Sequence, residues 1–171
     1  MINNMKITSD EIRELIKTHL DADRGYFSEK LYKTKAIKDS SFYAPSPVDL
    51  KHDFEEAKIW IARDFAIAVE DVKSLATNPF TIWDCDNMAR DLRVKLNKFH
   101  FRRYLQKKHN IDVEYAAFQV TDQRAYVFSQ YPVIHDFIMI FTENGIYFAD
   151  LMQDKVWSID DFKPAIISIG E

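Results

Sequence analysis

Residues 83–89 have the sequence WDCDNMA, and they begin the segment that most clearly defines the fold. Asp84 is a suitable helix N-cap, and acidic residues in a first turn suit the positive end of the helix dipole. Side chains then recur at spacings of three and four, which predicts one inward helical face. The stripe consists of Cys85, Met88, Ala89, Leu92, Leu96, Phe99 and Arg103. We therefore expect a long helix over about residues 85–108, with Cys85 in its first turn.

The sequence before this helix is also helical in character. Thr8 and Glu11 form a capping-box pattern followed by apolar residues at helical spacing, which predicts a helix over about 9–20. A second helix is predicted over about 49–65, and the residues between these helices are expected to have little regular structure. We expect a single domain over residues 1–171. Residues 1–40 would form an N-terminal helical extension, and residues 41–171 would form the core.

Beyond Ile111 the sequence becomes strand-like. Segments rich in β-branched and aromatic residues are followed by turn signals, and Asn144-Gly145 is the strongest hairpin signal in the chain. The predicted strands are 113–120, 125–128, 133–142 and 146–151, with a further short strand near 156–159. Helices followed by an antiparallel sheet predict an α+β domain.

The composition narrows the classes of function. The chain has 171 residues, of which 47% are hydrophobic and only three are glycine, so Gly-rich phosphate-binding loops are excluded. One cysteine cannot form an internal disulfide, and no apolar run reaches the roughly 18 residues that cross a bilayer. We expect a cytoplasmic protein that binds no membrane. No cofactor is predicted, and no metal site, because His100 and His109 lie too far apart on one helix.

Cys85 is the one residue whose position suggests covalent chemistry. A helix N-terminus and a nearby imidazolium both lower the pKa of a thiol, and the thiolate is the nucleophile. Of the five histidines, only His135 lies on a predicted strand that can pack against the Cys85 helix. Asp150 lies on the next strand, where it could orient His135. A lone buried cysteine is more often a small core residue than a nucleophile. The catalytic hypothesis for Cys85 therefore depends on His135 and Asp150 lying beside it.

The segments around these residues resemble a known superfamily. Residues 84–89 resemble the acidic-Cys-acidic-x-x-Ala motif of bacterial transglutaminase-like cysteine proteinases and related phage proteins. Residues 135–141 and 145–152 resemble the family's His-initiated strand and the strand that ends in its catalytic acid. The similarity covers roughly residues 40–168. It implies a papain-like fold and a Cys85-His135-Asp150 triad that hydrolyses peptide or amide bonds of a protein substrate, or transfers the acyl group to an amine. A phage-encoded member would act in the host cytoplasm.

The sequence does not decide two parts of this site: the acid that orients His135, and the donors that would bind the oxyanion. If Asn144-Gly145 were a two-residue turn, His135 would face Asp154, and Asp150 would lie roughly 13 Å along the strand. Asp154 is therefore the alternative acid. An acyl-transfer site also needs hydrogen-bond donors for the oxyanion. The backbone N–H of Cys85 is one candidate, and the side chains of Gln119, Trp83 and Asn78 are others.

The long helix also has a basic surface that competes with the hydrolase hypothesis. Residues 90–109 contain eight Lys or Arg and one acid, a net charge of +7 that leaves −11 on the rest of the chain. Such a surface could bind nucleic acid or an acidic partner, or it could attract the acidic remainder of the same molecule. The other alternative is a catalytically inactive transglutaminase-like fold that serves as a protein-binding module.

Overall fold

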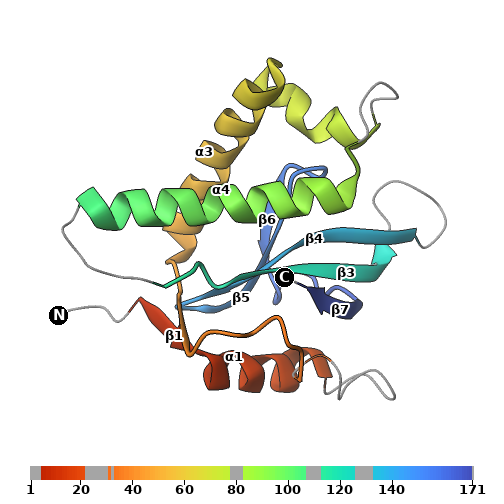
Figure 1. The fold of residues 1–171 in the computed structure, drawn as a ribbon. Helices are drawn as coiled ribbons and strands as arrows, with labels where there is room; N and C mark the ends of the chain where they lie inside the picture. Colours follow the sequence, from red (N-terminus) through yellow and green to blue (C-terminus); the bar gives the residue numbers. More distant parts are fainter. Residues whose placement is uncertain are drawn as a thin grey trace.

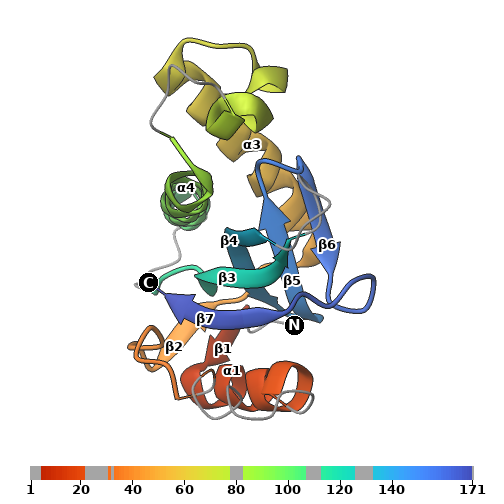
Figure 2. The ribbon, with the colours of Figure 1, turned by 90° about the vertical axis from the view of Figure 1, so that its right-hand side faces the viewer.

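The fold is an antiparallel sheet with helices on both faces, seen in a computed structural model (Figure 1). The structure describes residues 5–21, 31, 33–77, 83–106, 113–125 and 133–170. Helices α3 (Pro47–Phe65) and α4 (Cys85–Gln106) cover one face, and α1 (Ser9–Ile16) covers the other (Figure 2). The predicted α+β class is confirmed. No helix in the described ranges is long and apolar enough to cross a membrane.

The main sheet has five strands in the order β6-β5-β4-β3-β7, with β4 in the centre. Their bounds are β3 Ala117–Ala125, β4 Val133–Thr142, β5 Gly145–Asp150, β6 Lys155–Ser158 and β7 Ile166–Gly170. The prediction for 133–142 is confirmed residue for residue. Strand β3 begins four residues later than the predicted 113, and β7 was not predicted. Residues 126–128, predicted as part of a strand, lie outside the described residues.

The β4–β5 hairpin forms, but its turn lies one residue earlier than assumed. Thr142 pairs with Gly145, so the two-residue loop is Glu143-Asn144. Gly145 has a φ of +118°, a conformation that favours glycine, and this explains its place after the loop. Ile138 consequently pairs with Ala149, so His135 does not lie opposite Asp154 as the assumed turn implied.

Helix α1 begins where its capping residues predict. The capping box of Thr8 and Glu11 is formed, and the helix continues into a π-helical turn, Lys17–Asp21. Helix α3 begins at Pro47, two residues before the predicted start, and Ser46 caps it by accepting a hydrogen bond from the backbone of Asp49 at 3.0 Å. A 3₁₀ helix, η2, follows over Val69–Thr77.

A second, small sheet lies near the N-terminus. Strand β1 (Lys6–Thr8) pairs with β2 (Ser41–Tyr43), which lies in the segment expected to have little regular structure. Three-residue strands are too short for a periodic pattern to predict them.

Strand β4 is buried on both faces, which accounts for its nearly continuous apolar sequence. Ile138 and Ile140 pack into the cluster that includes α3 and α4. Phe137, Met139 and Phe141 pack into the cluster on the side of α1. Residues of the predicted N-terminal extension contribute to this second cluster: Ile7, Ile12, Ile16, Leu20, Leu31 and Ile37.

Candidate active site

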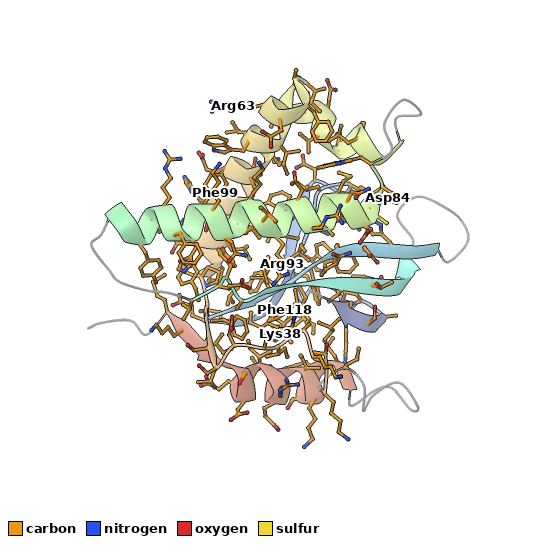
Figure 3. The ribbon with its side chains drawn as sticks, viewed as in Figure 1. Lys38, Arg63, Asp84, Arg93, Phe99 and Phe118 are labelled. Atoms are coloured by element: carbon orange, nitrogen blue, oxygen red, sulfur yellow. The ribbon has the colours of Figure 1, made fainter. Side chains whose placement is uncertain are left out.

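Helix α4 begins at Cys85, as its predicted N-cap requires. The Asp84 carboxylate accepts a hydrogen bond from the backbone N–H of Asn87 at 3.1 Å, and its carbonyl accepts from Met88 at 3.0 Å. Figure 3 shows Asp84 at the start of the helix. Cys85 is partly exposed, whereas Met88 and Ala89 are buried against the sheet. The thiol therefore lies at the positive end of the α4 dipole and within reach of solvent.

His135 is held by Asp150. The His135 Nε2 lies 2.7 Å from Asp150 Oδ2, and each residue is 3% exposed. The second carboxylate oxygen, Oδ1, accepts a hydrogen bond from the backbone N–H of Met152 at 2.9 Å, which fixes the acid in turn. The paired part of β4 and β5 runs only as far as Ile138 and Ala149, so His135 lies beyond it and reaches Asp150 diagonally.

Cys85 is the second partner of the His135 ring. The Cys85 side chain forms a hydrogen bond with the His135 ring, in addition to the bond between His135 Nε2 and Asp150 Oδ2. Burial alone lowers the pKa of His135. The hydrogen bonds to Asp150 and Cys85, and the negative charges of both, outweigh burial and raise this pKa to about 9. At neutral pH the ring is thus protonated, and it places a positive charge beside the Cys85 side chain.

Gln119, expected as an oxyanion donor, is engaged elsewhere. Its Nε2 donates to Asp136 Oδ2 at 2.8 Å and also to Asp86 Oδ1. Both N–H bonds of the amide are therefore used within the protein. Trp83 packs edge-on against Phe65, with ring centroids 4.3 Å apart.

Asp154, the alternative acid, lies away from His135. Its Oδ1 accepts a hydrogen bond from Lys58 Nζ at 2.6 Å, in an ion pair that links the β5–β6 turn to α3. The structure thus brings together Cys85, His135 and Asp150 and leaves Asp154 outside. Asn78 lies outside the described residues.

Asp122 is a buried acid that the sequence reasoning missed. It is 3% exposed and pairs directly with His135 across the β3–β4 ladder. Its Oδ1 accepts a hydrogen bond from the backbone N–H of Ala165 at 2.8 Å, which ties β3 to the segment before β7. The residues around Asp122 are mostly polar, so the sequence offered no signal that this acid is buried.

A second buried polar cluster joins α3 to the C-terminal half of α4. Asp53, 1% exposed, accepts hydrogen bonds from Arg103 and from the Tyr115 hydroxyl, the latter at 3.1 Å. The His100 ring stacks on Tyr43 with centroids 3.8 Å apart. Burial lowers the pKa of His100 to about 4, outweighing its hydrogen bond to the backbone of Val113. This histidine is therefore neutral.

Most described basic side chains of α4 contact groups of the same chain. These contacts are Arg93 with the Ala117 carbonyl and Glu114, Lys95 with Asp64, Lys98 over the Trp60 ring, and Arg103 with Asp53. Lys107, Lys108 and His109 lie outside the described residues. The described contacts match one of the two alternatives for the basic surface, attraction to acidic groups of the same molecule. They also reduce the positive charge available to a nucleic acid.

Among the described residues, no group of three or more His, Cys, Asp or Glu side chains is arranged to hold a metal ion. No protein-family model matches the sequence, and no curated protein matches it. The functional assignment therefore depends on the geometry of the site.

Proposed function

We propose that this protein is a cysteine hydrolase that cleaves peptide or amide bonds of a protein substrate. Cys85 is the nucleophile, His135 the general base and acid, and Asp150 the residue that orients His135. The observation that carries the proposal is a buried imidazole that is bound by a carboxylate at 2.7 Å and hydrogen-bonded to a thiol at a helix start. No cofactor takes part in the proposed reaction.

The order of these groups along the chain supports a papain-like, transglutaminase-like fold. The nucleophile begins a helix, the base follows on a strand, and the acid ends the next strand of the same hairpin. A helix packed by its N-terminal turn against an antiparallel sheet suits this chemistry, because it aims the dipole and the base at one thiol.

The proposed chemistry is two-step acyl transfer. The Cys85 thiolate attacks the carbonyl carbon, and protonated His135 gives its proton to the departing amine as the C–N bond breaks. Water then attacks the thioester and loses a proton to His135, and the C–S bond breaks, which releases the carboxylic acid and restores the thiolate beside protonated His135. An amine in place of water would give transamidation.

The start of α4 also provides a donor for the oxyanion. The backbone N–H of Cys85 lies in the first turn, where N–H groups have no intrahelical acceptor. Because the Gln119 amide is occupied by two carboxylates, this backbone group is the better candidate.

The decisive test is the alkylation rate of Cys85 by iodoacetamide as a function of pH, followed by intact mass. The chain has one thiol, so each added mass reports Cys85 alone. We expect rapid alkylation well below about pH 8.5, the reference value for a free thiol, and a return toward free-thiol behaviour in His135→Gln.

Asp150→Asn and Asp154→Asn form a matched pair for the identity of the acid. Both replace a β5–β6 carboxylate by an amide of equal size. We expect Asp150→Asn to abolish the low-pH reactivity, because the amide no longer stabilises the imidazolium, and Asp154→Asn to keep it. A thiol that is unreactive, or indifferent to both His135 and Asp150, would contradict the hydrolase and favour the binding module.

A further inference from the structure

Helix α4 is joined to β3 and its preceding segment by a row of hydrogen bonds. The helix residues are spaced by seven, four and three, and the strand residues by two. The contacts are Gln119 Nε2 with Asp86 Oδ1, Arg93 Nε with the Ala117 carbonyl, Asn97 Oδ1 with the Tyr115 N–H, and His100 Nε2 with the Val113 carbonyl. Figure 3 shows Arg93 between α4 and the sheet.

The helix side of the row is regular, because steps of seven, four and three return to one face of a helix. From residue 86 to residue 100 a helix rises about 21 Å, so the four contacts are spread along most of α4. A longitudinal shift of α4 would break all four contacts together, whereas apolar packing alone tolerates small displacements because it is not directional.

Gln119 is the contact nearest the site, and it binds two elements at once. Asp86 follows Cys85 in α4, and Asp136 follows His135 in β4. The Gln119 amide donates to both carboxylates, at 2.8 Å in the case of Asp136. It also satisfies two acids of like charge that would otherwise repel each other. The bridge therefore links the residue after the thiol to the residue after its base.

We infer that Gln119 is a positioning residue: by bridging Asp86 and Asp136, it holds the first turn of α4 where Cys85 meets the His135 ring. Its consequence for catalysis rests on the proposed function. Gln119 is assigned no contact with the Cys85 thiol or the His135 ring. It acts through the position of the helix.

The test uses Gln119→Leu, which keeps the volume and removes both donated hydrogen bonds. Two signals are followed against pH: Cys85 alkylation by iodoacetamide, and the NMR titration of the His135 ring. We expect the alkylation rate at pH 7 to fall about tenfold or more, because the thiolate loses its cation. The His135 midpoint should fall below the wild-type value, because the hydrogen bond and charge of Cys85 no longer raise its pKa.

Asn97→Ala is the matched control, since it removes another contact of the same row far from the thiol. It should lower the melting temperature and leave the His135 midpoint unchanged. A reversed bridge supplies the rescue: Gln119→Glu combined with Asp86→Asn and Asp136→Asn lets two amides donate to one carboxylate. This triple variant should recover most of the wild-type alkylation profile. If Gln119→Leu does not fold, the triple variant still tests whether the bridge positions Cys85.

The outcomes separate this inference from the proposed function. If the wild-type thiol is activated but Gln119→Leu behaves like Asn97→Ala, with a stability loss alone, the inference is overturned and the hydrolase stands. If the wild-type thiol reacts like a free thiol but the His135 midpoint still falls in Gln119→Leu, the hydrolase is overturned and the positioning role stands. Failure of the triple variant to restore either signal, although folded, also counts against the bridge.

Discussion

One buried histidine lies beside the N-terminal turn of α4 and another lies within its C-terminal half, and their environments shift their pKa values in opposite directions. His135, near the N-terminal turn, has its pKa raised to about 9, and His100, in the C-terminal half, has its pKa lowered to about 4. Both are almost fully buried, at 3% and 0% exposure. Burial lowers the pKa of each, so burial does not explain the difference between them.

The placement of one carboxylate accounts for the contrast. Asp150 contacts the imidazole of His135 directly, whereas Asp53, the buried acid near His100, binds the Arg103 guanidinium instead. The charge of Arg103 then further disfavours a protonated His100. A buried histidine becomes a cation only where the acid is its own partner. At neutral pH the first histidine is therefore protonated and the second is neutral, in a cluster that joins α3 to α4.

The largest effect on stability is expected from Asp53→Ala. It leaves the Arg103 guanidinium and the Tyr115 hydroxyl without their buried acceptor, at a cost of about 3 kcal/mol in the free energy of unfolding. Urea denaturation measures this, and Asp49→Ala is the control. Asp49 is 3.6 Å from Arg103 and 36% exposed, so its loss should cost under about 1 kcal/mol. Equal losses in the two variants would contradict the assigned role of Asp53.

Alkaline pH should weaken the fold through His135. Its folded pKa of about 9 lies above the unfolded value of 6.5, so the stabilisation is complete below pH 6.5 and is lost as pH rises through 9. The difference between the folded and unfolded pKa values corresponds to at most about 3 kcal/mol in the free energy of unfolding. Urea denaturation from pH 6 to 9.5 should show this decline in wild type, and a much flatter profile in His135→Gln. Parallel profiles would rule out the raised pKa.

Acid pH should act through His100 with the opposite sign. Its folded pKa of about 4 lies below the unfolded 6.5, so as pH falls the unfolded chain binds the proton first and stability declines between these values. His100→Gln retains a donor for the Val113 carbonyl but does not titrate. The wild type should therefore lose up to about 3 kcal/mol relative to this variant between pH 6.5 and 4. A constant difference across that range would show that His100 is protonated in the fold.

The smallest predicted effect concerns the helix cap beside Cys85. Asp84→Ala removes the acceptor for the Asn87 N–H and should cost about 1 kcal/mol by urea denaturation. Asp84→Asn, which can still cap, should cost less. If both variants lose the same stability, the charge of Asp84 matters more than its hydrogen bond.

Local signals predicted the helices and the central strand. Caps at Thr8 and Asp84 fix two helix starts through bonds within one turn, and the apolar run 133–142 marks a strand buried on both faces. Strands β1, β2 and β7 were missed because each is short and depends on partners distant in sequence, as in the pairing of Thr121 with Ser168. Residues 113–116 look like a strand, yet they serve mainly as partners of α4 and β2.

The site was predictable in its residue types and less so in its geometry. Sequence order and pattern selected Cys85 and His135, and the family resemblance selected Asp150, whereas a one-residue error in the turn placed Asp154 opposite His135. The correct register depends on Gly145 following the loop, a choice made by backbone conformation. The Gln119 bridge was also beyond sequence reasoning, since it requires α4, β3 and β4 to meet.

The order of the triad along the chain has a consequence for protein synthesis. The Cys85 segment leaves the ribosome before His135 and Asp150 have been added, so the nascent thiol has neither partner. Even a complete chain brings the three together only after the β4–β5 hairpin has closed and α4 has docked on it. A half-made or misfolded copy therefore carries Cys85 without its partners, and the contacts with His135 arise only in chains that have completed the fold.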